Sequence, residues 1–175
     1  MFNVRRSVRY HRRREQFLDR CSDWMKVLTA VAGSAAAMAL LAESPWSQYV
    51  AFMVAILAAS NLVFAPGRHA REHALLAVEF IRLEADLVRA EADLTDAKIR
   101  ELTARKLTLE EGEPPHFRVL NAICFTETAK ALGCSPDQYI DVPWYKRAFA
   151  NLVDVFPGEL EKRIDALSRS AHHTR

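Results

Sequence analysis

Charged and apolar residues are sharply segregated along this chain of 175 residues. Two segments, 27–42 and 44–67, contain no Lys, Arg, Asp or Glu, and only Glu43 separates them. A helix on the surface of a soluble protein normally carries a polar stripe, whereas a helix that is apolar all round is buried in protein or in a membrane. The pattern therefore predicts two apolar helices joined by a tight link.

The second apolar segment is long enough to cross a bilayer. Its 24 residues would span about 36 Å as a helix, against a hydrocarbon core of about 30 Å. Trp46 and Tyr49 lie at one end, where amphipathic rings favour the membrane interface. The 16 residues of the first segment give only about 24 Å. We predict a two-helix transmembrane hairpin over residues 27–67. A soluble bundle with two buried helices and a signal peptide cleaved near Ala42 are the alternatives.

The distribution of basic residues predicts the orientation of this hairpin. Residues 1–26 hold eight Lys or Arg, and Arg68 and Arg71 follow the second segment. The link at residues 43–45 has neither Lys nor Arg. Cytoplasmic loops carry the excess of positive charge in membrane proteins. We therefore expect both termini in the cytoplasm and the link on the other side of the membrane.

Small residues within the hairpin indicate where helices would meet, because they let backbones approach closely in a bilayer. The predicted packing residues are Ala30, Gly33, Ser34 and Ala37 in the first helix and Ala51, Ala55 and Ala58 in the second. Two helices cannot enclose a channel alone, so a pore would need several copies. Ser60 and Asn61 are the polar residues that we would place on its wall or at a helix contact.

Residues 68–111 contain no Pro or Gly and carry eight basic and ten acidic residues. This mixture predicts one long cytoplasmic helix, or two nearly continuous ones, exposed to solvent. Its apolar residues alternate in steps of four and three, which is the spacing of a coiled-coil seam. The seam comprises Leu76, Phe80, Leu83, Leu87 and Leu94. It could pack against helices of the same chain or hold a homo-oligomer together.

Residues 112–175 predict a small helical cytoplasmic segment. A helix from about residue 115 to 132 would be closed by Gly133, and another would cover about 143–156. The second of these carries Trp144, Tyr145, Lys146 and Arg147, a composition that suits a helix lying on the inner leaflet. The same aromatic residues could instead close the core of the bundle. No segment shows convincing strand alternation, so the chain is expected to be an all-α membrane protein.

The sequence contains no catalytic or nucleotide-binding motif such as a P-loop, G-x-G-x-x-G, H-E-x-x-H or C-x-x-C. Three pairs have the residue types for chemistry: Cys124 with His116, Cys21 with His11, and His69 with His73. The first two lack an evident orienting partner for a thiol nucleophile, and the third lacks a further nearby metal ligand. We therefore expect no enzyme activity, no cofactor and no metal.

The arginine-rich start RRSVRYHRRRE favours a topology signal that also contacts anionic lipid headgroups. Two other interpretations are pairing between subunits with the acidic helix at 84–96 and binding to nucleic acid. The formal net charge is only +2, which argues against a protein that coats nucleic acid through phosphate contacts. We expect the lipid bilayer, and no nucleic acid, as a partner.

The order of these parts resembles the SLATT family, the SMODS- and SLOG-associating two-transmembrane effector domains of bacterial conflict systems. The resemblance covers about residues 5–155. It rests on the basic start before a small-residue hairpin and on the segments RHAREHALLAVEFIRLEADL, EGEPPHFRVLNAICFTETAKALG and VPWYKRAF. It implies an antiviral defence effector that oligomerises and perturbs or permeabilises the inner membrane. It also implies an activating partner, either a nucleotide second-messenger synthase or a nucleotide sensor encoded nearby. A membrane scaffold and an accessory subunit of a channel or transporter are the alternatives.

Overall fold

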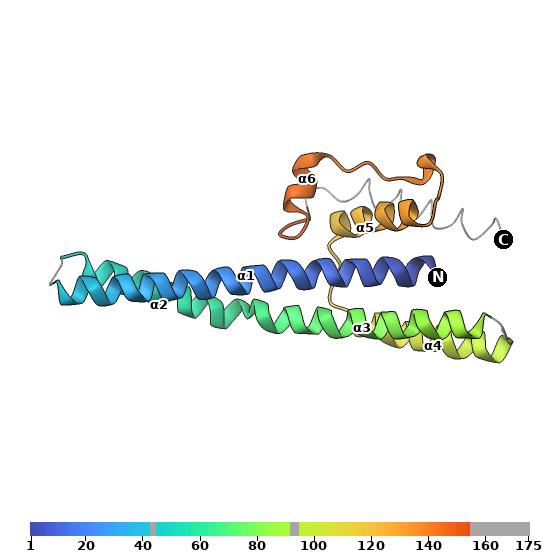
Figure 1. The fold of residues 1–175 in the computed structure, drawn as a ribbon, viewed down its shortest axis with the longest axis horizontal. Helices are drawn as coiled ribbons and strands as arrows, with labels where there is room; N and C mark the ends of the chain where they lie inside the picture. The colour runs from blue at the N-terminus through green and yellow to red at the C-terminus, as the bar shows by residue number, and fades with distance from the viewer. Residues whose placement is uncertain (43–44, 92–94, 155–175) are drawn as a thin grey trace. The chain divides into compact units, whose positions relative to one another are not determined.

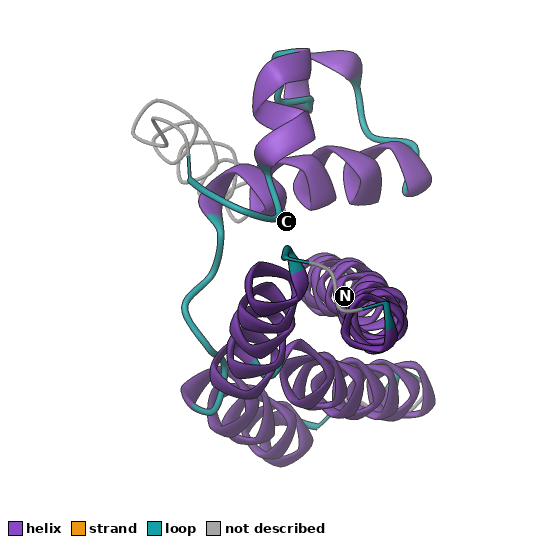
Figure 2. Cartoon of the chain, turned by 90° about the vertical axis from the view of Figure 1, so that its left-hand side faces the viewer, coloured by secondary structure: helices purple, strands orange, loops and turns teal. Residues whose placement is uncertain are grey.

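The computed structural model describes residues 1–42, 45–91 and 95–154 (Figure 1). Every regular element in these ranges is a helix, and Figure 2 contains no strand among the residues that it describes. This confirms the all-helical fold class. The chain divides into two compact units. We call residues Arg14–His73 the apolar unit, and we call Met1–Arg13 together with the described residues from Ala74 onward the polar unit.

Helix α1 is continuous from Phe2 to Leu41, so the basic start and the first apolar segment belong to one helix of 40 residues. Helix α2 follows from Ser47 to Phe64. It ends at Ala65, whose left-handed conformation (φ 38°) lets its N–H bond to the carbonyl of Asn61. Helix α3 then begins at once, at Pro66. Helices α2 and α3 are therefore separated by Ala65 alone.

Helix α2 has no buried residue. Large apolar side chains are exposed on it, among them Phe52 (65%), Leu62 (82%) and Val63 (77%). By length and composition, the described residues contain one helical stretch, Ser47–Ala90, with a segment apolar enough to cross a membrane. This stretch comprises α2 and α3, and the apolar segment is α2. A second crossing within α1 stays a prediction, and residues 43–44 of the expected link lie outside the described residues.

The half-buried faces of the apolar helices differ from the predicted packing faces by one residue. In α2 the half-buried positions include Val50, Val54 and Leu57, each one residue before a predicted alanine. In α1 only Gly33 of the predicted set is half-buried. The other predicted packing residues are exposed within the chain: Ala30, Ser34, Ala37, Ala51, Ala55 and Ala58. Within one chain, therefore, larger aliphatic residues supply the covered face of α2.

In the polar unit the chain reverses between α3 (Pro66–Ala90) and α4 (Asp96–Glu111). Arg105 of α4 pairs with Asp86 of α3 and lies 3.5 Å from Glu79 of α3. In one continuous helix these residues would be too far apart along the axis to touch. The prediction of a single long helix is therefore wrong. The segment forms two helices, as the alternative had it, but the second folds back along the first. Thr95 starts α4 as its N-cap, accepting a hydrogen bond from the N–H of Lys98 at 3.3 Å.

The predicted seam is filled from within the chain. Phe80 and Leu83 of α3 are buried (0% and 1% exposed) in a core with Val4 of α1 and Leu102 of α4. Leu87 packs partly against this core. Leu76 is half-buried, and Leu94 lies outside the described residues. The two central positions of the seam are thus used for packing in cis.

A second core surrounds α5 (Arg118–Ala131), which is buried on most of its circumference. Tyr10 of α1, Ile140 and Val142 close it. Gly133 follows α5 in the left-handed conformation (φ 69°), as expected of a helix-ending glycine. A 3₁₀ turn, η1 (Pro136–Gln138), leads to α6.

Helix α6 is confined to Trp144–Phe149, much shorter than the expected 143–156. Trp144 (80%), Tyr145 (46%) and Phe149 (51%) are exposed, so these aromatic side chains do not close the bundle core. Residues 155–175 lie outside the described residues. The interpretation in which these aromatic residues close the core is therefore wrong for the described residues. A position of α6 on the inner leaflet stays a prediction.

Candidate functional site

Two segments of the polar unit bring together a group of two histidines and one glutamate in the described part of the chain. His11 lies on α1, and Glu113 and His116 lie on the connector between α4 and α5. Gly112 ends α4, and Pro114 and Pro115 cannot continue a helix because proline lacks the N–H donor and fixes φ. The connector therefore stays extended and presents Glu113 and His116 to α1.

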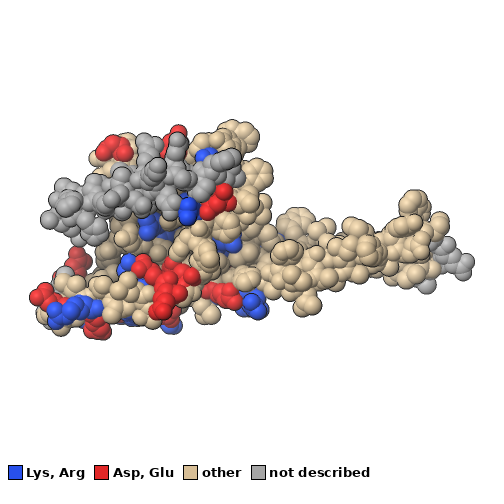
Figure 3. All heavy atoms as spheres, turned by 180° about the vertical axis from the view of Figure 1, so that it is seen from behind, with Lys and Arg blue, Asp and Glu red and all other residues tan. Residues whose placement is uncertain are grey.

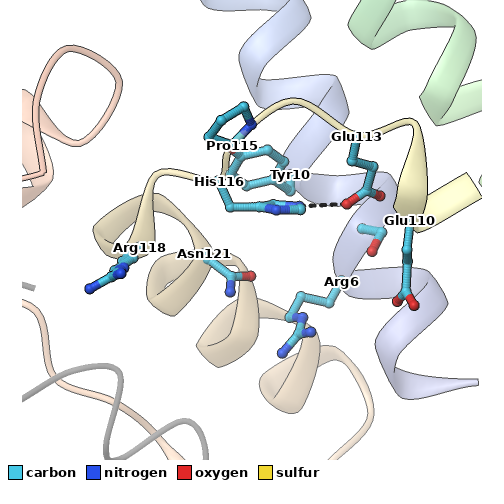
Figure 4. A pocket seen from close by; sticks show the side chains of 9 residues that line it. Arg6, Tyr10, Glu110, Glu113, Pro115, His116, Arg118 and Asn121 are labelled. Carbon is cyan, nitrogen blue, oxygen red and sulfur yellow. Dashed lines mark ion pairs between the residues drawn. The ribbon is translucent and has the colours of Figure 1, made fainter. Parts of the chain in front are cut away.

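Glu113 lies between the two imidazoles. One carboxylate oxygen, Oε1, is 3.1 Å from Nε2 of His11. The other, Oε2, is 2.8 Å from Nε2 of His116, the ion pair drawn as a dashed line in Figure 4. The side chains of His11 and Glu113 are 0% and 4% exposed, whereas that of His116 is 37% exposed. The carboxylate thus ties a fully buried histidine to one that opens toward solvent.

Aromatic rings fix this group on both sides. The His11 ring stacks on Phe80, with centroids 5.7 Å apart and planes inclined by 12°. The Tyr10 ring packs at 4.7 Å from the ring of His116. The hydroxyl of Tyr10 accepts a hydrogen bond from the backbone N–H of Phe117 at 2.9 Å. The site is therefore a rigid junction between the two cores of the polar unit.

The two histidines control the charge on Glu113. Burial by itself would raise the pKa of this carboxyl group, but the hydrogen bonds from His11 and His116 outweigh it and lower the pKa to about 2. Glu113 is consequently an anion at neutral pH. Nearby, burial lowers the pKa of Arg6, an effect that the carboxylates of Glu110 and Glu113 partly offset.

A partly open pocket of about 390 Å³ adjoins the exposed side of this group. Figure 4 shows Arg6 from α1, Glu110 from α4 and Asn121 from α5 around it, with His116 and Glu113 on one wall. Its lining is mainly polar and contains both signs of charge. The pocket gives solvent a path to His116.

The pKa of Glu113 predicts a distinctive acid sensitivity. Because the pKa of Glu113 in the folded chain is below its ordinary value of 4.5, its ionised form stabilises the fold above about pH 5, and this stability is lost as the pH falls toward 2. The contribution is up to about 3 kcal/mol. In chelator-containing buffer, Glu113→Gln should lower the free energy of unfolding at pH 7 by an amount of this size. The gap from wild type should shrink on acidification, as measured by denaturant unfolding at a series of pH values. A gap that is independent of pH would contradict the assignment.

The other sequence candidates are placed differently. Cys124 is fully buried in α5, and burial raises the pKa of its thiol to about 12, the opposite of what a thiolate nucleophile needs. His116 pairs with Glu113 instead. His69 pairs with Glu72 at 2.9 Å, whereas His73 is buried. In the third candidate pair, His11 contacts Glu113, and Cys21 is half-buried. In the described residues, His11, His69 and His116 thus each contact a glutamate.

The basic start forms part of the folded helix α1. Arg5 binds Glu84 of α3 at 2.6 Å, and Arg13 pairs with Glu127 of α5. The acidic helix that was a candidate partner between subunits is therefore engaged within the chain by Arg5. These pairs are partly exposed, so each is worth at most about 1 kcal/mol. Their role is to position α1 between the cores of the polar unit.

The two apolar segments, the first group of membrane candidates, present an uncharged surface. On the face seen in Figure 3, the surface over the C-terminal part of α1 and over α2 carries no Lys, Arg, Asp or Glu. Ser60 and Asn61 are half-buried on α2. Lys146 is half-buried, and Arg147 donates to the carbonyl of Val142 at 2.8 Å. The polar residues of α2 and the aromatic residues of α6 thus stay candidates for membrane contacts.

Sequence reasoning missed the His11–Glu113–His116 group because its members are distant in the chain. His11 and Glu113 are 102 residues apart. The available signal was local: Glu113 and His116 flank two prolines, a rigid spacing that suits convergent ligands. Comparison of the chain with protein-family models, with curated proteins and with solved structures found no match.

Proposed function

We propose that this chain is a non-enzymatic membrane effector. Its two apolar segments would form a transmembrane hairpin, and activation by a partner would assemble copies that perturb the bilayer. The observation that carries the proposal is the surface of α2, which has no buried residue and no charged residue. In water such a surface would be a large unpartnered apolar patch, whereas in a bilayer it is solvated by lipid.

The polar groups of the first apolar segment support the same environment. The hydroxyl of Thr29 donates to the carbonyl of Met25 at 2.8 Å, and that of Ser34 donates to the carbonyl of Ala30 at 2.9 Å. Hydroxyl groups that bond back to their own helix need no water. The segment can therefore enter hydrocarbon without leaving these donors unsatisfied.

The exposed small residues support assembly. Six of the seven predicted packing residues are exposed within the chain, among them Ala30, Ala37 and Ala55, so they are available to helices of another copy. Lys and Arg are in excess before and after the proposed hairpin, which would place both termini on the cytoplasmic side of a bacterial inner membrane. The resemblance to the SLATT family supports two further parts of the proposal: a role in defence against phage, and activation by a nucleotide second-messenger synthase or a nucleotide sensor.

Leakage from liposomes tests the proposal. The full chain, reconstituted with an entrapped dye and with the product of a neighbouring sensor or synthase gene, should release the dye. Replacing Ser60 and Asn61 by Leu should reduce release, because it removes the polar groups that a wet path along α2 would need. Ser47→Leu with Gln48→Leu, at the other end of the same helix, is the matched control and should leak like wild type.

Oligomer size must be measured on each variant, so that failed assembly is separated from a blocked path. Leakage that is unchanged in the Ser60 and Asn61 double variant removes these residues from the mechanism. Wild-type chain that inserts and oligomerises but releases no dye would favour the alternative, a membrane scaffold that recruits partners through its cytoplasmic helices.

A further inference from the structure

We infer that His11, Glu113 and His116 form a binding site for a divalent transition-metal ion of the zinc type. Their donor atoms all lie within 4.8 Å of one another. Two imidazole nitrogens and one carboxylate oxygen are a set that Zn²⁺ accepts, and they leave its fourth position open. Mg²⁺ and Ca²⁺ prefer sets made of oxygen alone, so the two nitrogens select against them.

The distances fit the ion with small adjustments. The two imidazole Nε2 atoms face different oxygens of Glu113, at 3.1 and 2.8 Å. In a tetrahedral site with bonds of about 2.0–2.1 Å, the ligand atoms are about 3.3 Å apart. An ion could therefore be seated by shifts of about 1 Å or less in the donor atoms. In its absence, the same atoms satisfy one another by hydrogen bonds.

The surrounding structure holds the ligands in place before any ion arrives. Pro114 and Pro115 restrict the backbone between Glu113 and His116, so little conformational entropy is lost when both bind. Phe80 stacks on the His11 ring at 5.7 Å, and Tyr10 packs on His116 at 4.7 Å. Rigid supporting side chains of this kind distinguish a built site from a chance cluster on a surface.

The adjoining pocket supplies the access that a metal site needs. His116 is 37% exposed and lines this pocket, so an ion and a water ligand can enter from that side. The bound ion would join α1 to the connector between α4 and α5, and so hold the two cores of the polar unit together. This inference does not depend on insertion of the chain into a membrane.

Zinc titration of the full chain in detergent micelles tests the inference. After treatment with a chelator and desalting, the protein should take up one Zn²⁺ per chain in competition with a chromophoric chelator. When Co²⁺ replaces Zn²⁺, the protein should show the visible absorption bands that are typical of Co²⁺ with a low coordination number. Zinc should also raise the melting temperature, because it binds the folded state alone.

Two variants and one control locate the site. His116→Ala and Glu113→Gln should each weaken zinc binding by at least about tenfold and remove the zinc-induced rise in melting temperature. His69→Ala is the matched control. His69 pairs with Glu72 at 2.9 Å, as His116 does with Glu113, but it belongs to no three-ligand group among the described residues. It should bind zinc like wild type.

The partial exposure of His116 makes its replacement the decisive test, since folding can be checked by helicity in the absence of metal. If Glu113→Gln fails to fold, the comparison of His116→Ala with His69→Ala decides alone. Wild-type protein that takes up no zinc, or zinc uptake that is equal in His116→Ala and wild type, would overturn the inference and leave the group a hydrogen-bonded junction.

Discussion

Replacement of Phe80 by alanine is expected to lower the free energy of unfolding by about 3–5 kcal/mol. The ring is 0% exposed and packs among Val4, Leu83 and Leu102, residues of three helices that cannot all move inward to fill the space. Domains of this size are stable by only about 5–15 kcal/mol. The loss is therefore a large part of the total, and denaturant unfolding followed by helicity should show it.

Ile81→Ala is the control, because the neighbouring residue on the same helix is 40% exposed and outside both cores. Its cost should be small, within about 1 kcal/mol. Equal losses from the two variants would contradict the cis packing of the seam. A loss for Phe80→Ala that appears only at concentrations where wild type is oligomeric would instead place Phe80 at an interface between copies.

The helical class followed from the sequence because its signals are local. Long runs without Pro or Gly, the distribution of charge and Gly133 after α5 need no tertiary information. The turn between α3 and α4 could have been found from Thr95-Asp96, an N-cap followed by an acidic first turn. It was missed because the seam spacing appeared to continue through it.

Other features depend on contacts that no local pattern contains. The half-buried face of α2 is displaced by one residue from the predicted face, because small residues were assigned to contacts that Val50, Val54 and Leu57 make instead. One residue turns a helix by about 100°, so the choice depends on the neighbouring helix. The His11–Glu113 contact depends in the same way on how α1 packs against a connector 102 residues away.

These misses have one physical origin. A periodic pattern indicates which side chains share one face of a helix. Which other helix packs against that face depends on how the shapes and volumes of the side chains fit in three dimensions. In the polar unit the partner was the chain itself, as the Phe80 core and the Arg5–Glu84 pair show. The alanines predicted to pack in the two apolar segments are exposed among the described residues. The lipid and assembly contacts that we propose would therefore lie on the apolar unit.

Replacement of Ile56 by arginine separates a membrane helix from a soluble one more sharply than any other single change. Ile56 lies at the middle of α2 and is 42% exposed. If water surrounds α2, a charged residue at an exposed helix position changes stability by only about 0.5 kcal/mol. If hydrocarbon surrounds it, the charge costs about 2.5–3.5 kcal/mol on insertion scales. We expect the second outcome, with loss of the protein from the alkali-resistant membrane fraction.

Leu75→Arg provides the matched control, since Leu75 is 68% exposed on α3, outside the apolar segment. That variant should stay in the membrane fraction and keep its helicity, because Leu75 lies beyond Arg68 and Arg71, which follow the second apolar segment. Both variants place an arginine at an exposed aliphatic residue of a helix. A difference between them therefore reports whether water or hydrocarbon surrounds each helix, and not the effect of charge in general. Membrane retention of Ile56→Arg equal to that of Leu75→Arg would show that α2 does not lie in the bilayer, and the effector proposal would fall with it.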